Sequence, residues 1–410
     1  MKIKFLLLVL LFSNSAYSNY KLETVLDDLD DAWSLVFLSE DKILFTEMSG
    51  KLKVASLSDK SVNEIDNVPL VQYSGQGGLS DVALDPDFES NNMIYLTYSA
   101  KDQNKKTTLF LLSAELNGNA LENSKVIFQA KAPRRSPMHL GAKIAFLSDD
   151  TILLTSGDGF DHREKAQSLD NHFGKIIRIN KDGSIPKDNP FINVKDALPE
   201  IYSYGHRNMQ GLVVTKSGKI YEHEHGPKGG DEINLIQPSL NYGWPAITYG
   251  IDYSGAVISP FTEKDGMEQP LLHWTPSIAP SDILYYENDF YPELKNSFLV
   301  TALVSKDVKK VTFEDGIDVQ ESLFSEVNDR LRNIQASPNG ILYLLTDGPN
   351  GKLIKTDEDF TMYLLNSVGV AVVQGDAYGL SPFFRASFVA PEADLIRGGD
   401  KIQEACAALG

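Results

Sequence analysis

The sequence predicts an all-β protein: a six-bladed β-propeller over residues 19–356, followed by a short α/β appendage over residues 357–410. Three observations predict this fold. A strand–turn–strand unit recurs six times, polar turns separate the strands, and helical periodicity is almost absent before residue 357. A pair of β-sandwiches or a barrel are the alternatives. Six similar units favour radial repetition, because a propeller protects its strand edges without closing one barrel.

Each repeated unit contains two runs of β-branched and aromatic residues that flank a polar turn, such as Ser148-Asp149-Asp150 or Lys216-Ser217-Gly218. The second strands are centred near residues 44, 95, 153, 220, 298 and 343. Their spacing, about 45 to 80 residues, exceeds the roughly 40 to 50 of the best-known propeller repeats. We expect the surplus in loops between residues 156 and 282, and long loops of this kind usually carry a binding site.

The composition limits the classes of function. The 410 residues include 56 acidic and 38 basic side chains, which gives a net charge of −18. Such a surface repels phosphate backbones, so we expect no nucleic-acid partner. Cys406 is the single cysteine, so no disulfide can form within the chain. A protein of this size can fold without one because its core is large.

The N-terminus has the pattern of a secretory signal peptide over residues 1–18. Lys2 and Lys4 precede the apolar run Phe5–Phe12, and the small-residue segment Ala16-Tyr17-Ser18 follows. An apolar run of this length is too short to span a bilayer. We therefore expect cleavage near residue 18, a periplasmic or secreted mature chain, and no membrane span in that chain. An uncleaved interfacial helix is the alternative.

Functional residue types are densest between Tyr202 and Trp244, where glycines bracket Arg207 and Asn208 and a carboxylate-rich stretch follows. Glycines let the backbone approach a ligand, and carbonyl oxygens with carboxylates are the ligands that calcium prefers. The triplet His223-Glu224-His225 also allows a transition-metal interpretation, because alternate residues of a strand share a face. A third ligand at suitable spacing is not evident, so calcium is the preferred interpretation.

Short motifs occur in a fixed order along the predicted propeller. They are Gln76-Gly77-Gly78-Leu79, His139-Leu140-Gly141, Asn171-His172-Phe173-Gly174, Gly205-His206-Arg207-Asn208, Glu224-His225-Gly226-Pro227, Gly230-Asp231-Glu232-Ile233-Asn234, Asn241-Tyr242-Gly243-Trp244-Pro245, Trp274-Thr275-Pro276 and Arg330-Leu331-Arg332. With these motifs the chain resembles the soluble quinoprotein aldose sugar dehydrogenases, the pyrroloquinoline-quinone-dependent glucose/sorbosone dehydrogenase family.

The resemblance implies an enzyme that uses pyrroloquinoline quinone (PQQ) and Ca²⁺ to oxidise aldose sugars at the anomeric carbon to lactones. It implies a small-molecule sugar substrate and an electron acceptor that the sequence does not identify, in a monomer or a homodimer. Two other functions stay open. One is a calcium-stabilised carbohydrate-binding propeller without redox activity, and the other is a calcium-dependent lactonase.

The resemblance also implies roles for individual residues. His139 resembles the general base that takes the sugar's hydroxyl proton as hydride passes to the quinone, and Arg207 would stabilise the developing oxyanion. The cofactor-binding set would be Gln76, Arg207, Asn208, Trp274, Arg330 and Arg332. Backbone carbonyls of Gly226 and Pro227 resemble ligands of the calcium that docks the cofactor. Ligands of a second, structural calcium would be Glu232 and Tyr242.

Three positions depart from the family's pattern. Thr46-Glu47-Met48 lacks an arginine often found at that strand end, and Met138 stands where some members have an acid. Ala302-Leu303-Val304 lacks a lysine that members often offer the cofactor, and the sequence leaves open whether Lys306 replaces it. The loss of one partner for a cofactor carboxylate would weaken binding by about 1.5–3 kcal/mol.

The last segment differs in character from the propeller. Residues 369–379 and 383–388 precede a predicted helix over Ile402–Leu409, and together they resemble the end of a class I aminotransferase. Arg385 matches the arginine that binds a substrate carboxylate in that family. The lysine that forms the Schiff base with pyridoxal phosphate is missing, so we expect a non-catalytic remnant. It would come from a gene fusion or from an error in sequence assembly. A lineage-specific appendage that only looks similar is the alternative.

Overall fold

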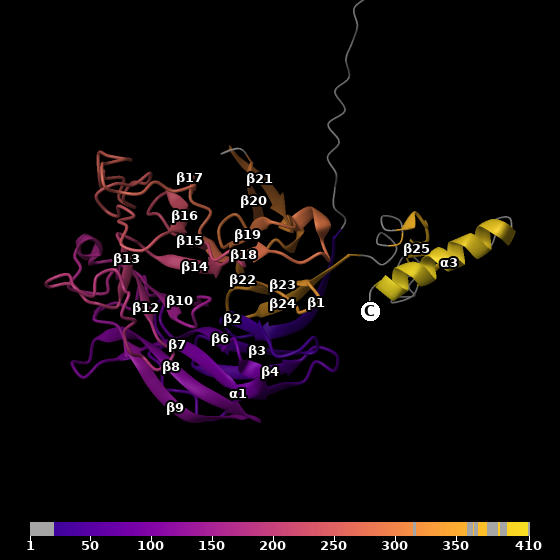
Figure 1. The fold of residues 1–410 in the computed structure, drawn as a ribbon, viewed down its shortest axis with the longest axis horizontal. Coiled ribbons are helices and arrows are strands. Elements are labelled where there is room, and N and C mark those ends of the chain that lie inside the picture. Colours follow the sequence, from indigo (N-terminus) through magenta and orange to yellow (C-terminus); the bar gives the residue numbers. More distant parts are fainter. Residues whose placement is uncertain are drawn as a thin grey trace, which may run out of the picture. The chain divides into compact units, whose positions relative to one another are not determined.

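Six four-stranded antiparallel sheets surround a central axis and confirm the predicted six-bladed β-propeller (Figure 1). The structure is a computed structural model that describes residues 20–314, 317–358, 364, 368–374, 384–385 and 392–408. The predicted signal peptide lies outside the described residues. The chain divides into two units: residues Leu22–Thr356 form the propeller, and Met1–Lys21 with Asp357–Gly410 form the second unit.

The first three blades follow the chain without interruption. Blade 1 contains β2 (Ala32–Phe37), β3 (Lys42–Glu47), β4 (Lys51–Ser56) and β5 (Val62–Glu64). Blade 2 contains β6 (Leu79–Leu84), β7 (Met93–Lys101), β8 (Thr107–Asn117) and β9 (Ala120–Gln129), with the short helix α1 (Phe88–Asn91). Blade 3 contains β10 (Gly141–Phe146), β11 (Ile152–Ser156), β12 (Lys175–Ile179) and β13 (Ile201–Tyr204).

The last three blades end with the closure of the ring. Blade 4 contains β14 (Met209–Val214), β15 (Ile220–Glu224), β16 (Asp231–Ile236) and β17 (Leu272–Trp274). Blade 5 contains β18 (Pro280–Tyr286), β19 (Ser297–Ala302), β20 (Val308–Glu314) and β21 (Ile317–Leu323). Blade 6 combines β22 (Leu331–Ala336), β23 (Leu342–Thr346) and β24 (Gly351–Glu358) with the N-terminal strand β1 (Tyr20–Leu29). All six predicted second strands are present as β3, β7, β11, β15, β19 and β23.

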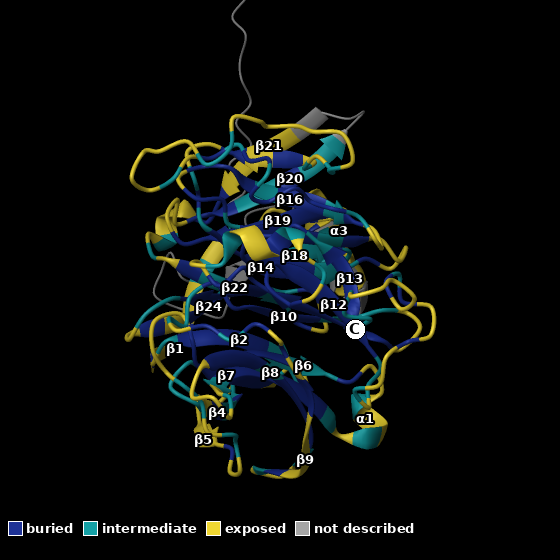
Figure 2. Ribbon diagram, turned by 90° about the vertical axis from the view of Figure 1, so that its left-hand side faces the viewer, coloured by how far each residue is buried: buried dark blue, intermediate teal, exposed yellow. Residues whose placement is uncertain are grey.

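Hydrophobic clusters join neighbouring blades, and Figure 2 shows that the strands near the axis are largely buried while the loops are exposed. Between blades 1 and 2, for example, Leu44 packs with Leu79 and Leu96, and all three are fully buried. The innermost strands β2, β6, β10, β14, β18 and β22 contact one another in a ring. The apolar runs of the sequence therefore become interblade cores.

Every innermost strand has an irregular register with its second strand at the same place. The third residue of each innermost strand lies at this bulge. These six residues are Ser34, Asp81, Lys143, Gly211, Asp282 and Asn333. Because they occupy equivalent positions in a ring, polar side chains from different blades meet at the centre of the propeller.

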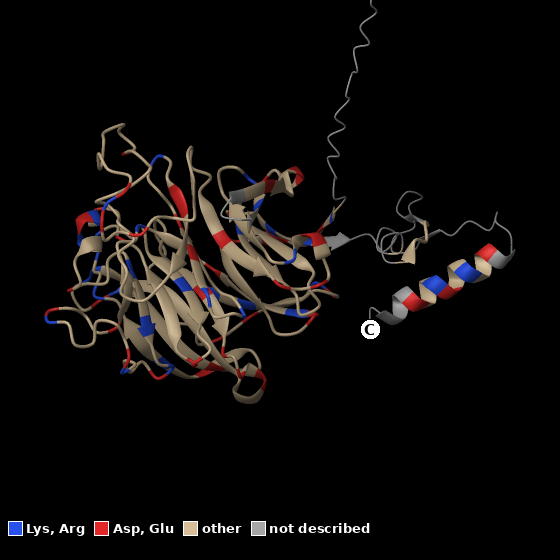
Figure 3. Ribbon diagram, turned by 45° about the horizontal axis from the view of Figure 1, so that its top comes forward, with Lys and Arg blue, Asp and Glu red and all other residues tan. Residues whose placement is uncertain are grey.

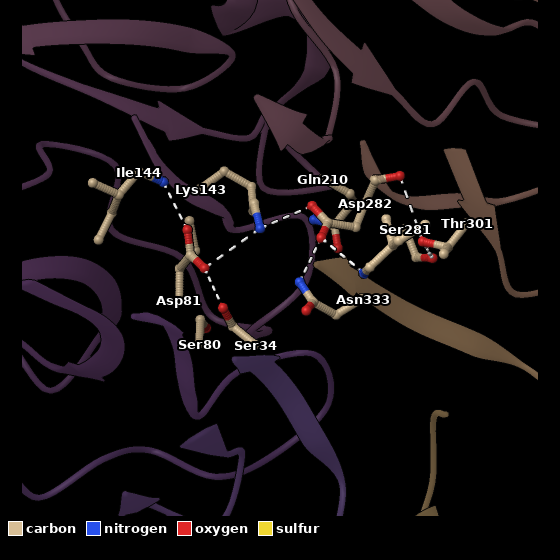
Figure 4. A network of polar contacts seen from close by, with 12 residues as sticks. Ser34, Ser80, Asp81, Lys143, Ile144, Gln210, Ser281, Asp282, Thr301 and Asn333 are labelled. Carbon is tan, nitrogen blue, oxygen red and sulfur yellow. Dashed lines mark hydrogen bonds and ion pairs between the residues drawn. The ribbon is translucent and has the colours of Figure 1, made fainter. Parts of the chain in front are cut away.

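Five of these residues form a central network of buried polar contacts: Ser34, Asp81, Lys143, Asp282 and Asn333 (Figure 4). The Nζ atom of Lys143 lies 3.4 Å from Oδ1 of Asp81 and 3.0 Å from Oδ1 of Asp282. Ser34 donates to Asp81 at 2.6 Å, and the side-chain amide of Asn333 donates to Asp282. The network thus links blades 1, 2, 3, 5 and 6 through one buried ammonium group.

Hydroxyl groups form a second set of contacts between neighbouring blades. Thr46 donates to the carbonyl of Ser80 at 2.6 Å, and Thr97 donates to that of Ala142 at 2.8 Å. Each bond runs from a second strand to the innermost strand of the next blade. Blade 4 has His223 where blades 1 and 2 have these threonines, so this blade departs from the repeated pattern.

In the second unit, β25 (Val373–Gln374) pairs with β26 (Phe384–Arg385), and α3 covers Glu392–Ala408. The predicted helix therefore exists but begins ten residues earlier than Ile402. Figure 3 shows acidic and basic residues along α3, where Arg397 pairs with Asp394 at 2.8 Å. Among the described residues, no helix has the length and apolar character needed to cross a membrane.

Replacement of Lys143 by Met should destabilise the propeller by about 3–5 kcal/mol, because two buried carboxylates lose their cation. Urea denaturation monitored by tryptophan fluorescence would measure the loss. Lys310→Met is the matched control. Its ion pair with Glu321, at 3.4 Å, lies on the outer strands, where such pairs contribute at most about 1 kcal/mol. Equal losses in the two variants would contradict a central role for Lys143.

Candidate functional site

Two neighbouring cavities contain most of the predicted site residues. The first, which we call the base cavity, has a volume of about 380 Å³ and is lined by residues that include His139, Asp158 and Arg207. The second, the clamp cavity, has a volume of about 290 Å³ and is lined by residues that include Gln76, Asn208, Arg330, Arg332 and Asp347. The pairs His139-Leu140 and Arg207-Asn208 each contribute to both cavities, which therefore share a wall.

His139 lies just before β10 in a left-handed backbone conformation, with a φ of 47°. Two side-chain contacts, of which the one with Arg134 is buried, hold this backbone. Its N–H donates to Oε1 of Gln76 at 2.8 Å, and its carbonyl accepts a hydrogen bond from Nη1 of Arg134 at 2.6 Å. A residue in this sparsely populated conformation persists only where its surroundings fix it. Gln76 and Arg134 therefore orient the imidazole, which lines the base cavity.

A buried carboxylate fixes the imidazole of His139. Nδ1 lies 2.7 Å from Oδ1 of Asp158, and the other oxygen of that carboxylate accepts a hydrogen bond from Nε1 of Trp244 at 2.8 Å. When Nδ1 carries the proton, Nε2 is free to act as a base. Burial lowers the pKa of His139, while the hydrogen bond with Asp158 opposes this shift. The imidazole is therefore neutral at pH 7, as a general base must be.

Arg207 is buried and held by contacts on both its backbone and its side chain. Its N–H donates to Oε2 of Glu224 at 2.7 Å, and Nη1 donates to the carbonyls of His225 and Gly226 at 2.8 and 2.6 Å. Its guanidinium carbon lies 5.3 Å from the ring centroid of Trp244. Nε has no hydrogen-bond partner among the described residues. Arg207 thus brings a fixed positive charge into the cavity that His139 also lines.

Arg330 and Arg332 face the same side, as predicted, and both hold Asp347. Nε of Arg330 lies 2.8 Å from one carboxylate oxygen, and Arg332 contacts the other through Nε at 2.9 Å and Nη2 at 2.7 Å. Burial raises the pKa of Asp347, but the two arginines outweigh burial and lower it. Lys306 does not line this cavity; its ammonium is 3.4 Å from the carbonyl of Asn328.

The structure does not bring Trp274 to either cavity. This side chain is buried in the core between blades 4 and 5 with Ile233 and Phe298, and its Nε1 donates to Gln320 at 2.8 Å. Trp274 is the last residue of β17. This strand is the outermost of blade 4, and two strands separate it from the innermost strand β14. Trp274 therefore contributes packing. The aromatic side chains that line the clamp cavity include those of Trp33 and Tyr73.

The predicted calcium ligands lie at two places. Pro227 lines the base cavity, whereas Gly226, Glu232 and Tyr242 line a third, small cavity of about 10 Å³ that Glu224 also borders. The carbonyl of Gly226 already accepts a hydrogen bond from Arg207, so only its second lone pair could hold an ion. The hydroxyl of Tyr242 donates to Leu235, which leaves its carbonyl as the potential ligand.

The triplet His223-Glu224-His225 does not form one metal site. The two imidazoles lie on the face of β15 toward blade 5, where Nε2 of His225 is 2.6 Å from the carbonyl of Pro280. Glu224 lies on the opposite face, where its Oε2 is 3.7 Å from Nδ1 of His206. Alternate residues of a strand share a face, which is why the two histidines were expected to converge. The same alternation places Glu224, which lies between them, on the opposite face.

Three residues with a place in the site were not singled out from the sequence: Asp158, Arg134 and Asp347. A signal existed for the two aspartates, because each follows a second strand and precedes a glycine, in Gly157-Asp158-Gly159 and Asp347-Gly348. Binding and catalytic residues occur disproportionately on such loops. No sequence signal marks Arg134, since its role depends on a backbone contact with His139.

The donors of the clamp cavity fit an anionic planar ligand. Guanidinium groups bind carboxylates in a planar fork, and Arg330, Arg332 and the amides of Gln76 and Asn208 all line this cavity. The unpaired Nε of the buried Arg207 marks a place for another acceptor. The propeller thus places anion-binding donors beside the oriented imidazole of His139.

Comparison with known proteins gives the family. The model of the Glucose / Sorbosone dehydrogenase family matches residues 29–355, and the chain belongs to this family. It is 34% identical over 349 residues to the aldose sugar dehydrogenase YliI of Escherichia coli, which covers 83% of this chain and 94% of the relative. It is 36% identical over 352 residues to an uncharacterised protein of Synechocystis, with coverage of 81% and 85%.

Solved structures agree with this assignment. A crystal structure of a glucose dehydrogenase is 37% identical, with a TM-score of 0.79 and coverage of 82% of this chain and 99% of that one. The PQQ-bound aldose sugar dehydrogenase of Streptomyces coelicolor is 25% identical, with a TM-score of 0.67 and coverage of 83% and 99%. A separate match, 52% identical over 67 residues, is to an aspartate aminotransferase of Rhizobium meliloti and covers 16% of each chain.

The contact between His139 and Asp158 predicts a titration that NMR can follow. The pKa of His139 should lie below 6.5, and Asp158→Asn should lower it further, because the carboxylate is the group that favours the protonated imidazole. The resonance can be assigned with His139→Gln. A pKa that rises in Asp158→Asn would contradict the pairing seen here.

Proposed function

We propose that this protein oxidises aldose sugars at the anomeric carbon to lactones, with PQQ and Ca²⁺ as cofactors. The observation that carries the proposal is the buried pair His139–Asp158, set 2.7 Å apart beside Arg207 in one cavity. Membership of the glucose/sorbosone dehydrogenase family supports a sugar dehydrogenase activity. The PQQ-bound relative supports the choice of cofactor.

His139 is the proposed base. Its Nε2 would take the proton of the anomeric hydroxyl, and Asp158 would stabilise the imidazolium that results. When bound, the quinone supplies the hydride acceptor and calcium polarises it. Arg207 would hold its positive charge toward the oxygen that becomes anionic. The remaining side chains of the clamp cavity would bind the cofactor's carboxylates: Gln76, Asn208, Arg330 and Arg332.

The metal assignments rest on backbone oxygens and on the small cavity. Carbonyls of Gly226 and Pro227 are the proposed ligands of the calcium that docks the cofactor. Glu232 and the carbonyl of Tyr242 are the proposed ligands of a second, structural calcium, since both border a cavity of about 10 Å³. That volume is about what one water-sized sphere occupies, so a single ion would fill it.

We also propose a periplasmic or secreted location, based on the signal-peptide pattern of residues 1–18. The C-terminal unit is proposed to have no transaminase activity. Its aminotransferase relative is matched over 16% of that protein's length, and Arg385, on β26, is the one substrate-binding residue of that enzyme identified in this chain.

Reconstitution tests the function directly. Purified protein supplied with PQQ and Ca²⁺ should reduce an artificial dye when glucose or another aldose is added, and lactone should accumulate in step with dye reduction. Omission of either cofactor should abolish turnover. Lactone hydrolysis without dye would instead favour a lactonase, and sugar binding without any turnover would favour a non-redox binding protein.

Substitutions at the base should separate chemistry from cofactor binding. His139→Gln should lower kcat by about 10²- to 10⁴-fold, the usual contribution of general base catalysis, while PQQ still binds. In the wild type, kcat/KM should fall as the pH drops through the pKa of His139, which lies below 6.5. In Asp158→Asn that acid limb should move to lower pH, with a reduced rate. An unchanged rate in His139→Gln would rule out its role as base.

A further inference from the structure

Blade 4 has a carboxylate at a position where the other five blades have an apolar residue. Glu222 lies on the second strand, immediately before His223, and is fully buried. In the other blades the equivalent residues pair, as Glu222 does, with the fourth residue of the innermost strand, and all are buried and apolar: Phe45, Leu96, Leu154, Val300 and Leu344. A carboxylate at a core position costs free energy unless something compensates its charge. A group that compensates the charge of Glu222 is therefore expected nearby.

Glu222 belongs to a cluster of buried ligand atoms between blades 3 and 4. Nδ1 of His206 lies 3.7 Å from Oε1 of Glu222 and 3.7 Å from Oε2 of Glu224. Side-chain atoms of these three residues all lie within 4.8 Å of one another. Two buried atoms of these residues, Nδ1 of His206 and Oε2 of Glu222, have no hydrogen-bond partner among the described residues.

The cluster brings several buried carboxyl groups together. Glu224 pairs with Glu232 across β15 and β16, and the amide of Asn234 donates to Glu222 at 2.8 Å and to Glu232 at 3.4 Å. Within the described part of the chain, no lysine or arginine forms an ion pair with any of the three glutamates. Burial raises the pKa of Glu224 to about 8 and raises that of Glu222 well above its usual range.

We propose that His206, Glu222 and Glu224 bind a divalent transition-metal ion. Glu224 also borders the small cavity of the proposed structural calcium, but His206 and Glu222 belong to neither proposed calcium site, and the proposal does not depend on the proposed sugar oxidation. One nitrogen and carboxylate oxygens suit zinc or manganese, whereas calcium takes six to eight oxygens. Metal–ligand bonds of about 2.0–2.2 Å would need only a small inward movement of the three side chains.

The surroundings of His206 suit a metal ligand. Its Nε2 lies 2.9 Å from the hydroxyl of Ser203, and its ring stacks on Tyr242 with centroids 4.7 Å apart. A hydrogen bond at the outer nitrogen fixes the tautomer that leaves the lone pair of Nδ1 directed at the ion. Burial lowers the pKa of His206 to about 3, so the imidazole is neutral and able to coordinate.

Manganese is the probe that tests the site, because its EPR spectrum reports the bound ligands. The full-length protein, stripped of metal and then saturated with Ca²⁺, should bind one further Mn²⁺ ion. Pulsed EPR should detect coupling to one imidazole ¹⁴N, and Zn²⁺ should displace the signal. Zn²⁺ should also raise the thermal unfolding midpoint, since it binds only the folded state.

Two variants of Glu222 test the assignment. Glu222→Leu restores the apolar residue that three other blades have at this place, so it should fold, and Glu222→Gln keeps the shape. Each should weaken Mn²⁺ binding by about 100-fold or more, abolish the ¹⁴N coupling and remove the stabilisation by Zn²⁺. His225→Gln is the control for the nearby imidazole and should keep the coupling.

Three results would overturn the proposal. One is Mn²⁺ held by oxygen alone in the wild type, which would place it in a calcium site. Another is unchanged binding in Glu222→Leu. The last is an absence of any Mn²⁺ binding beyond the calcium sites. In that case protons shared among the glutamates compensate the buried charge.

Discussion

The ammonium group of Lys143 is the contact on which the arrangement of the blades depends. It joins Asp81 of blade 2 to Asp282 of blade 5, while Ser34 and Asn333 attach blades 1 and 6 to the same carboxylates. The ring of inner strands keeps the cation and its two anions in place, and loss of one partner would leave an uncompensated buried charge. The network also borders the site, because Lys143 lies 5.3 Å from the ring centroid of Trp33, a residue of the clamp cavity.

Blade 4 has different residue types at several positions where the other blades resemble one another. Gly211 stands at the bulge where five blades have a polar side chain, and the ring of His223 occupies the space that a Cβ at Gly211 would enter. Glu222 replaces an apolar core residue, and Glu224 receives the backbone N–H of Arg207. The blade that holds Arg207 has thus exchanged hydrophobic packing for polar contacts. Its stability depends on satisfying those polar groups.

The architecture could be predicted well from the sequence because the features that indicate it lie close together along the chain. Alternating apolar residues and turn chemistry locate each second strand, and six copies make the repeat visible. The pairing of Arg330 with Arg332 on one side followed from strand periodicity in the same way. Two-residue spacing is a property of the backbone, so it survives whatever the tertiary contacts are.

Side-chain contacts between the ends of neighbouring strands were beyond this kind of inference. Asp347 meets both arginines within blade 6, and Asp158 meets His139 within blade 3, from loops that no periodicity describes. Trp274 looked like a ligand-binding residue because it lies in a characteristic motif, yet its strand is the outermost of its blade. The buried pair Glu222 and His206 also needs the fold to become visible, since one comes from β15 and the other from the loop before β14.

Closure of blade 6 by β1 has a consequence for how the chain reaches its native state. More than 300 residues separate β1 (Tyr20–Leu29) from its partner β24 (Gly351–Glu358). During synthesis β1 emerges among the first segments, and its partner emerges only after every other blade has been made. Strand β1 therefore has an unpaired edge until β24 has been synthesised. An unpaired edge is the condition that favours strand exchange between nascent chains. Pairing of β1 with β24 is therefore the step that completes the propeller.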